Sequence, residues 1–514
     1  MPSGMSGTGG PKGVLPGAGS ALALLLAINL FNYIDRQILS ATLPLIRNDA
    51  NIFRAIDDWA EFKLGALTTA FMVAYMVLAP VFGRARGRMS RWVIVGGAVI
   101  FWSLATGGTG LATGYAVLFL TRCLVGVGEA AYGPIAPAML SDLYPVDHRG
   151  RVMSWFYAAI PVGSALGFVI GGAIGQTALG WRGTFLIAVI PGLLLGAVCF
   201  AMRDHTRARE DLDPDTLPPA PGPSYWSVLR ELRSIRSFVL CCAGMTASTF
   251  VLGGVASVMQ LYIFEREARF VLDEAAIAKM ETRTNSAGER YVPDEIAKKL
   301  RGKAGPQEMT AAKLRAVLDA TLDETELKSA SEWLYTDATA PDSIKNATIA
   351  ISLGGIIVVA GLAATLLGGV AGDWLRKRGV KGAYFLVAGW GTLAGFPFFV
   401  AILYVPFPLA WVMIFLAVFA LFFNTGPANT VLANVTRGEI RATAFAINIL
   451  IIHALGDAIS PPIIGLIKVW SSLHDAFLAV SFLIPVAGVL WVLGARHLDG
   501  DTQRAESANI QFKV

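Results

Sequence analysis

Six ionisable side chains lie inside stretches that are otherwise apolar, and these are the residues best suited to chemistry. They are Asp35, Arg36, Arg122, Glu129, His453 and Asp457. An ionisable group in the middle of a membrane costs roughly 3 kcal/mol or more, so it usually faces a protein interior and has a partner there. A carboxyl beside an arginine in such a place can gain or lose a proton at modest cost.

Spacing indicates how these groups are oriented. Arg122 and Glu129 are seven residues apart, so they project from one face of a helix, about 10 Å apart along its axis. Asp35 and Arg36 are adjacent and therefore point in different directions. We expect Asp35 to reach Arg122 or Glu129 across a contact between two helices. Asp35 and Glu129 are the proton-coupling candidates and Arg122 the anion-binding cation, and the alternative is a static ion-pair network.

Further polar and aromatic side chains are candidates for substrate binding or charge pairing. His453 and Asp457 are four apart on one helical face, where histidine could titrate, although a packed, hydrogen-bonded histidine is the commoner case. Arg36 belongs to the same set. The segment "FFNTGPANT" supplies Asn424 and Asn429, with a helix kink at Pro427 as the other interpretation. The set is completed by Tyr33 and Tyr132, which could equally be packing residues.

The composition is that of a membrane protein. Of the 514 residues, 54% are hydrophobic and 15% are charged, against roughly 25% charged in soluble domains. The mean hydropathy is +0.57 and the sequence pI is about 9.0. The basic residues concentrate in short loops, so they do not indicate a nucleic-acid partner. Because we find no nucleotide loop, metal cluster or nucleophile triad, we expect neither an enzyme nor a cofactor.

Apolar stretches long enough to cross a bilayer occur twelve times, which predicts an all-α polytopic protein with two six-helix bundles. The expected crossings are 20–46, 62–84, 92–112, 114–140, 151–175, 183–202, 238–264, 344–371, 382–404, 407–433, 441–468 and 473–497. The predicted organisation is a tail 1–19, a first bundle 20–202, a linker 203–237, a second bundle 238–497 and a tail 498–514. Arginine and lysine lie in alternate loops, so we expect both termini in the cytoplasm and the chain in the plasma (inner) membrane.

Two segments outside the bundles have more than one interpretation. Residues 224–236 form an amphipathic stretch that either lies on the membrane surface or is a solvated helical linker. Residues 265–343 form a charged insert with two short helices expected. The insert is either an extracytoplasmic cap or interaction surface, or an insertion with no role in transport.

The two halves of the chain repeat each other. "FGRARGRMSRW" follows the second crossing and "GGVAGDWLRKRG" follows the eighth, at equivalent places. The distances from Arg151 to Gly175 and from Arg441 to Gly465 are also equal. Two similar six-helix halves are typical of transporters that alternate access between them.

The sequence resembles the major facilitator superfamily, through a loop motif visible as Gly369, Asp373 and Arg376. More narrowly, it is similar to the Spinster family. This likeness is carried by "NLFNYIDRQILSATLP", "LVGVGEAAYGPIAPAMLSDLYP", "RGRVMSWFYAAIPVGSALGFVIGG" and "EIRATAFAINILIIHALGDAISPPIIG". The resemblance implies gating loops at Gly83, Arg88, Asp142, Arg149, Arg151, Gly369, Asp373, Arg376 and Arg441. One departure is Gly87, where the family motif has an acid that helps to hold the cytoplasmic side closed.

The resemblance implies a secondary transporter, monomeric and proton-linked, for an amphipathic anion such as a sphingosine phosphate or a lysophospholipid. The main alternative is a proton symporter for small organic anions such as sugar acids. A third is a non-transporting receptor that uses the insert to bind a partner, which the charges within the crossings disfavour.

Overall fold

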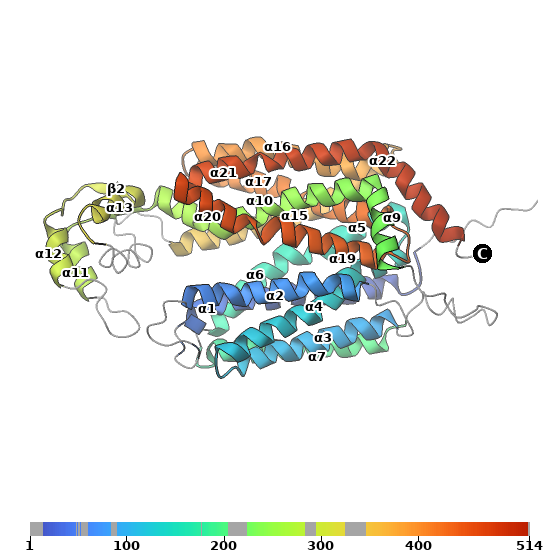
Figure 1. The fold of residues 1–514 in the computed structure, drawn as a ribbon, viewed down its shortest axis with the longest axis horizontal. Coiled ribbons are helices and arrows are strands. Elements are labelled where there is room, and N and C mark those ends of the chain that lie inside the picture. The colour runs from blue at the N-terminus through green and yellow to red at the C-terminus, as the bar shows by residue number, and fades with distance from the viewer. Residues whose placement is uncertain are drawn as a thin grey trace, which may run out of the picture.

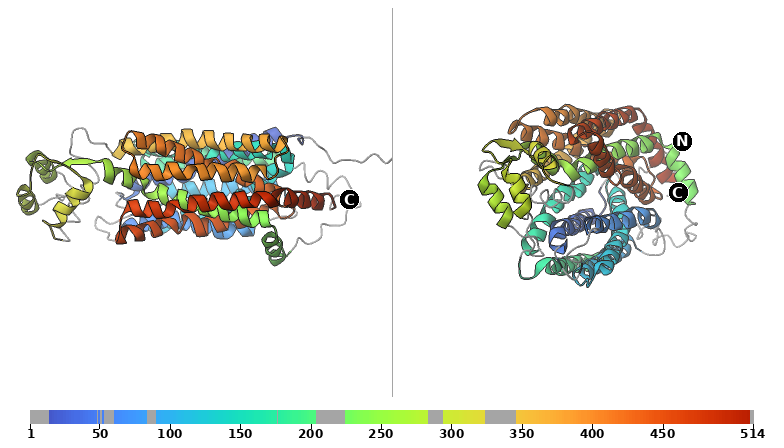
Figure 2. Two further views of the ribbon diagram at one scale, coloured as in Figure 1. Left: turned by 90° about the horizontal axis from the view of Figure 1, so that it is seen from above. Right: turned by 60° about the vertical axis from the view of Figure 1, so that its left-hand side comes forward.

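Residues 14–47, 49, 52, 60–83, 90–175, 177–203, 224–282, 294–323 and 346–511 of the computed structural model are described here. Within these residues, twelve helices are long and apolar enough to cross a membrane, in agreement with the sequence prediction. Figures 1 and 2 show them as two side-by-side bundles, the first blue to teal and the second green and orange to red.

The first bundle contains six crossings. Its helices are α1 (Ala18–Arg47), α2 (Ala60–Phe82), α3 (Arg91–Gly110), α4 (Tyr115–Leu143), α5 (Val146–Tyr157) with α6 (Ala159–Gly175), and α7 (Gly180–Ala201). A short helix, α9 (Tyr225–Ser234), precedes the second bundle and buries Val228 and Leu232. The amphipathic pattern of 224–236 is therefore a helix.

The second bundle contains the other six crossings. Its helices are α10 (Arg236–Glu267), α15 (Asn346–Lys377), α16 (Ala383–Tyr404), α17 (Leu409–Phe422) with α18 (Thr425–Asn434), α19 (Arg441–Ile452) with a π-helical turn η1 (His453–Asp457) and α20 (Ser460–Trp470), and α21 (Leu473–Ser481) with α22 (Leu483–Gln511). The predicted C-terminal tail thus continues α22 as far as Gln511. Asp373 lies within α15, beyond the predicted end of that crossing.

Prolines explain most of the interruptions in these crossings. Pro161, Pro427 and Pro485 each follow a helix break by three or four residues. A proline has no N–H to donate to the carbonyl one turn earlier, so the helix is weakened at that point. The break before Pro427 shows that the kink considered for this segment is present.

The insert forms a small folded unit. Strands β1 (Arg269–Val271) and β2 (Glu308–Thr310) pair antiparallel with Phe270 opposite Met309, beside helices α11 (Glu274–Thr282), α12 (Asp294–Arg301) and α13 (Ala311–Asp319). Figure 1 shows it projecting from one end of the second bundle, here called the insert end. Phe270 and Leu300 belong to the same hydrophobic cluster as Ile263 of α10 and Phe477 of α21. The core of the insert is therefore continuous with that of the second bundle.

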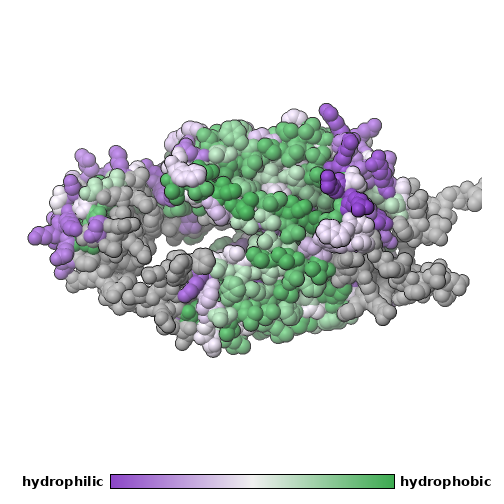
Figure 3. Space-filling view, in the orientation of Figure 1, coloured by the Kyte–Doolittle hydropathy of each residue, from purple (hydrophilic) through white to green (hydrophobic). Residues whose placement is uncertain are grey.

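The two bundles meet mainly at the opposite end, where α22 finishes, here called the C-terminal end. Contacts across the boundary involve α5 with α15 and α18, and α19 with α2 and α4. The space-filling view shows a hollow between the bundles at the insert end and an apolar surface across the visible face of both bundles (Figure 3). The structure is therefore closed at the C-terminal end.

Candidate functional site

An ion pair between α1 and α4 lies at the boundary of the two bundles. The Nε and Nη2 atoms of Arg36 each lie 2.7 Å from Oε2 of Glu129. The Glu129 side chain is fully buried and that of Arg36 is 16% exposed. Oε1 of Glu129 is also buried and makes no hydrogen bond of standard geometry, although the Asn32 side chain lies close to the carboxylate. One oxygen of this carboxylate therefore receives both arginine nitrogens, and the other keeps an unfilled acceptor site.

Three aromatic rings surround the guanidinium of Arg36. Its central carbon lies 5.2 Å from the ring centre of Tyr33, 4.9 Å from that of Phe71 and 4.8 Å from that of Tyr75. Rings at these distances attract a cation through their quadrupole. The cage holds Arg36 in place while adding apolar surface around the charge.

Asp35 and Arg122 occupy the interior of the first bundle. Thr106 of α3 donates a hydrogen bond of 2.6 Å to Oδ2 of Asp35, whose buried Oδ1 has no partner. Arg122 donates to the Thr109 hydroxyl at 2.5 Å and lies over the Phe185 ring. Asp35 makes no hydrogen bond or ion pair with Arg122 or Glu129, although its charge lies close enough to interact with that of Arg122. Arg36 reaches Glu129 instead, because the face of α1 with Arg36 points toward α4 and the neighbouring face points toward α3.

The second bundle contributes a further acid and base to the boundary. Nδ1 of His453 lies 3.0 Å and 2.9 Å from the two carboxylate oxygens of Asp457, in the π-helical turn η1. The His453 ring packs edge-on against Tyr75 of the first bundle, at 5.7 Å between ring centres. Single π-helical turns are often found at functional sites. Tyr75 thus contacts Arg36 on one side and His453 on the other.

A second group of charges closes the C-terminal end. Asp142 at the end of α4 accepts from Arg91 of α3 at 2.6 Å and pairs with Arg441 at the start of α19. Arg441 is buried and also donates to the Thr436 carbonyl at 2.9 Å. We call Arg91, Asp142 and Arg441 the terminal latch. It joins the bundles, because Arg441 belongs to the second and the other two to the first.

Asp373 of α15 makes a second connection between the bundles at this end, from the side of the second bundle. Its Oδ1 accepts from the Tyr384 hydroxyl at 2.8 Å and its Oδ2 from the backbone N–H of Arg151 at 2.9 Å. Arg151 was predicted as a gating residue through its side chain, whereas its hydrogen bond to Asp373 uses its backbone. Arg376 pairs with the exposed Asp147 at 2.9 Å.

Arg149 completes the polar contacts at this end. It donates to the side-chain oxygen of Asn434 at 3.0 Å and to the Tyr144 carbonyl at 3.2 Å. Asn434 belongs to α18 of the second bundle, so Arg149 crosses the boundary as expected for a gate.

Two glycines allow the helices to approach closely here. A Cβ at Gly83 would lie 2.6 Å from that of Ala446, and the Gly83 carbonyl accepts from Thr443 at 3.0 Å. A Cβ at Gly369 would lie 1.8 Å from Oγ of Ser154 and 2.4 Å from the Gly150 carbonyl. No side chain larger than hydrogen fits at either place while the end is closed.

Three predicted substrate contacts are placed in packed interiors instead. Tyr132 is 2% exposed and its hydroxyl donates to the Leu25 carbonyl at 2.7 Å. Asn424 donates to the Leu421 carbonyl at 2.5 Å, and Asn429 to that of Thr425 at 2.8 Å, both within their own crossing. The two asparagines donate to carbonyls of their own crossing and Tyr132 to a carbonyl of α1, so we assign all three to packing. Arg88, the remaining predicted gating residue, and Gly87 lie outside the described residues.

Sequence reasoning missed Thr106, Thr109 and Tyr384 as partners of these charges. A threonine inside a crossing usually bonds to its own helix backbone, so its type alone gives no signal. The available signal was spacing: Thr106 and Thr109 share a face of α3. Among the described residues, no group of three or more His, Cys, Asp and Glu side chains is arranged to hold a metal ion.

Comparisons with known proteins bear on this arrangement. The family model described as Major Facilitator Superfamily matches residues 25–272. The human protein spinster homolog 1 is 40% identical over 250 residues, which are 48% of this chain and 46% of that protein. The spinster homolog 1 of Xenopus tropicalis is 29% identical over 504 residues, 94% of this chain and 81% of that protein.

The chain is therefore similar to the Major Facilitator Superfamily over residues 25–272, and to a spinster protein over nearly its whole length, in line with the resemblance seen in its sequence motifs. The chain spans about half the length of the mammalian spinster proteins that it matches.

A solved structure shares the fold of this chain. It is described as a bacterial homologue to the human lysosomal transporter Spinster, in an inward-facing and unoccupied conformation. The TM-score is 0.52 at 17% identity, over 95% of this chain and 99% of that one. At this identity the likeness concerns the fold of twelve helices in two halves.

Proposed function

We propose that the chain is a secondary transporter that moves an amphipathic, anionic, lipid-like molecule by alternating access, coupled to protons. The proposed substrate class is that of sphingosine phosphates and lysophospholipids. The observation that carries the proposal is the Arg36–Glu129 pair at the boundary of two bundles that are apart at one end and joined at the other.

Proton coupling rests on the half-filled carboxylate of Glu129. A buried carboxylate needs its hydrogen-bonding capacity satisfied, and Oε1 makes no hydrogen bond of standard geometry. Protonation would neutralise the group and release Arg36, which could then pair with an arriving anion. A proton and a substrate anion would therefore act on one ion pair, which is the requirement for coupling.

The substrate class rests on the surroundings of Arg36. Guanidinium groups bind phosphate and carboxylate in a two-pronged manner. Tyr33, Phe71 and Tyr75 add apolar surface beside that cation. A molecule with one anionic head and an apolar tail matches both parts of this site.

The alternative is a symporter of small organic anions such as sugar acids. It is favoured by the His453–Asp457 pair, which adds polar groups on the facing side of the boundary. A small hydroxylated anion would use donors and acceptors on both sides, whereas a lipid tail would not.

The proposed setting is the plasma (inner) membrane, with a monomeric chain and both termini in the cytoplasm. It follows from the arginine-rich loops at one end of the bundles. In that orientation the closed C-terminal end faces the cytoplasm, and the described conformation is outward-open.

The test is uptake of labelled lysophospholipid or sphingosine phosphate into proteoliposomes, with and without an imposed pH gradient. We expect gradient-stimulated uptake that Glu129→Gln abolishes. The matched control is Glu265→Gln, which removes an acid paired with Lys468 at 2.9 Å near the insert end of the second bundle, and which should leave uptake unchanged.

The other outcomes separate the parts of the proposal. Lipid uptake that ignores both the gradient and Glu129→Gln would remove the proton coupling and keep the lipid substrate. Absence of lipid uptake together with gradient-driven uptake of a sugar acid would establish the alternative. Failure of both substrate classes would overturn the transport proposal.

A further inference from the structure

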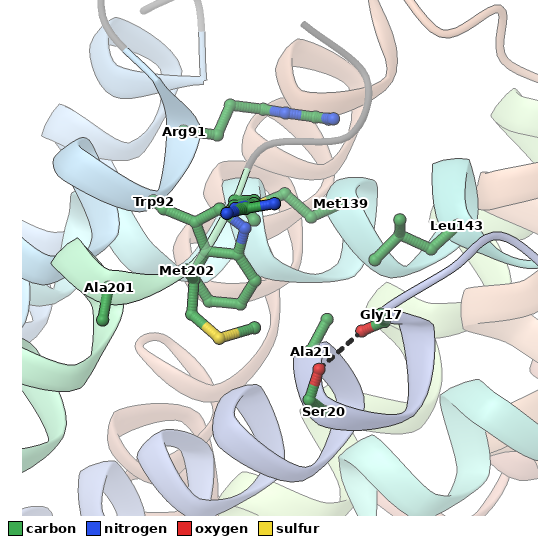
Figure 4. A pocket seen from close by; sticks show the side chains of 10 residues that line it. Gly17, Ser20, Ala21, Arg91, Trp92, Met139, Leu143, Ala201 and Met202 are labelled. Carbon is green, nitrogen blue, oxygen red and sulfur yellow. Dashed lines mark hydrogen bonds between the residues drawn. The ribbon is translucent and has the colours of Figure 1, made fainter. Parts of the chain in front are cut away.

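A separate cavity of about 220 Å³ lies inside the first bundle at its C-terminal end. It lies between the beginnings of α1 and α3 and the ends of α4 and α7 (Figure 4). The residues that line it are Gly17, Ser20, Ala21, Arg91, Trp92, Met139, Leu143, Ala201, Met202 and Arg203. None of the residues proposed to handle the substrate is among them.

The charge of this cavity is positive. Its lining contains Arg91 and Arg203 and no acidic residue. Within the described part of the chain, no acid forms an ion pair with Arg203, whereas Arg91 donates to Asp142. Helices α1 and α3 begin at the cavity and α4 and α7 end there, so their dipoles largely cancel. The two arginines therefore make the electrostatic potential in the cavity positive, which favours binding of an anion.

Size and position narrow the class of anion. A volume of about 220 Å³ is smaller than the roughly 300–1,000 Å³ of pockets for drug-sized ligands. Trp92, Met139 and Met202 supply an apolar wall beside the cations. The lining residues lie at the ends of their crossings, the depth at which lipid head groups are found. A phosphate group fits this combination, and either a phospholipid or a soluble phosphate ester could carry it.

We propose that this cavity is a binding site for a phosphate-bearing anion held between Arg91 and Arg203, and that its occupancy stabilises the closed terminal latch. The site lies apart from the Arg36–Glu129 pair, so the proposal does not rest on the proposed transport function.

The coupling arises because Arg91 serves two groups. In the closed state Asp142 has both Arg91 and Arg441 as partners. When the C-terminal end opens, Arg441 leaves with the second bundle, and Asp142 keeps its ion pair with Arg91 and its weaker interaction with Arg149 of the first bundle. An anion that binds to Arg91 competes with Asp142 for that arginine. The competition is weaker in the closed state, where Asp142 also pairs with Arg441, so the anion should bind more tightly there. By linkage, binding of the anion favours closure to the same extent that closure favours binding.

The first experiment measures binding of labelled inorganic phosphate and glycerol 3-phosphate to the full chain in phosphatidylcholine nanodiscs. We expect Arg203→Gln to weaken binding about tenfold, the effect of losing one charge-assisted hydrogen bond. Ala201→Leu, which adds bulk at an exposed lining position without changing charge, should also weaken it. The matched control is Arg236→Gln, an exposed arginine at the same end but outside the cavity, which should bind as the parent does.

A second arm identifies the source of the phosphate. Retention of phosphatidic acid against phosphatidylcholine is measured by native mass spectrometry on parent and Arg203→Gln protein. Selective retention lost in the variant supports a lipid head group, and binding of the soluble esters alone supports a soluble ligand. If neither source distinguishes the parent from Arg203→Gln, the site is overturned.

The coupling is tested by two substitutions outside the cavity that should act in opposite directions. Asp142→Asn removes the competitor for Arg91, so affinity for phosphate should rise several-fold. Arg441→Gln leaves Asp142 dependent on Arg91, so affinity should fall several-fold. If Asp142 and Arg441 only stabilise the fold, the affinity for phosphate should fall or stay the same in both variants. That result would overturn the coupling.

Discussion

The acids in the middle of the first bundle and those at the C-terminal end differ in how completely their carboxylate oxygens are hydrogen-bonded. Asp35 and Glu129 each have one bonded oxygen and one buried oxygen that makes no hydrogen bond of standard geometry. At the C-terminal end, Asp142 and Asp373 have both oxygens bonded, to Arg91 and Arg441 and to Tyr384 and the Arg151 backbone.

This difference distinguishes buried carboxylates that hold helices together from buried carboxylates that can bind a proton or a ligand. A buried polar atom without a partner costs about 1–3 kcal/mol, so a site that only holds helices together is expected to fill it. The acids at the C-terminal end behave as such joints. The acids in the middle retain an open acceptor, which a proton or a ligand can use.

The largest effect should come from removing the cation in the middle. Arg36→Gln leaves Glu129 buried without a positive partner, and losing one member of a buried pair costs about 3–5 kcal/mol. We expect a marked fall in thermal stability, followed by intrinsic fluorescence in detergent, and loss of uptake.

The double variant Arg36→Gln with Glu129→Gln sharpens this prediction. A neutral pair carries no uncompensated charge, so thermal stability should largely return while uptake stays absent. Failure of the second substitution to restore stability would show that packing of Arg36 against its rings, and not charge, was lost.

A smaller effect is expected from Gly369→Ala at the C-terminal end. The new methyl group would meet Ser154 and the Gly150 backbone, and such overpacking costs about 1–3 kcal/mol, which moves the equilibrium away from closure by roughly tenfold. Maleimide labelling of Thr443→Cys, a position buried at this end, should speed up. Gly355→Ala, on the same helix with open space around it, is the control and should not change the rate.

Asp373→Asn should weaken the same joint more modestly. The new NH2 group of the asparagine would face one of the two donors that now bond to Asp373. If it faces Tyr384, the hydroxyl can rotate and accept a hydrogen bond from it. We therefore expect closure to be destabilised by about 1 kcal/mol. The labelling rate of Thr443→Cys should rise only a few-fold. A rise as large as that for Gly369→Ala would mean that the carboxylate charge matters more than its hydrogen bonds.

The smallest effect is expected from Asp147→Asn. Its carboxylate is 64% exposed, and exposed pairs contribute about 0–1 kcal/mol. Thermal stability and labelling rate should match those of the parent. A clear change in either would show that the Arg376 contact belongs to the bonded joint around Asp373.

The number and type of the crossings could be predicted from sequence, because hydropathy and helix length follow directly from the solvent. The identity of the charged residues in the middle followed from the same argument. Their pairing did not: adjacent residues on α1 point to different neighbours, and which of them meets α4 depends on the rotation of α1 within the bundle. The sequence pattern contains no measure of that rotation.

Backbone contacts were also beyond prediction. Arg151 bonds to Asp373 through its backbone N–H, a group that every residue except proline has. The sequence prediction chose this position because of the arginine side chain, which is not the group that makes this hydrogen bond. For Tyr132 both interpretations stayed open, because an inward aromatic residue looks the same in sequence whether it faces a cavity or the interior of one bundle.

The shared core of the insert and the second bundle has a mechanical consequence. Because Phe270 and Leu300 pack into the same cluster as Phe477, we expect the insert to move together with the second bundle. Its far helices lie well beyond the ends of the crossings, so a small tilt of that bundle becomes a large displacement at α12 (Figure 1). A fluorescent dye attached to α12 would therefore report tilting of the second bundle, with no label needed within the lipid bilayer.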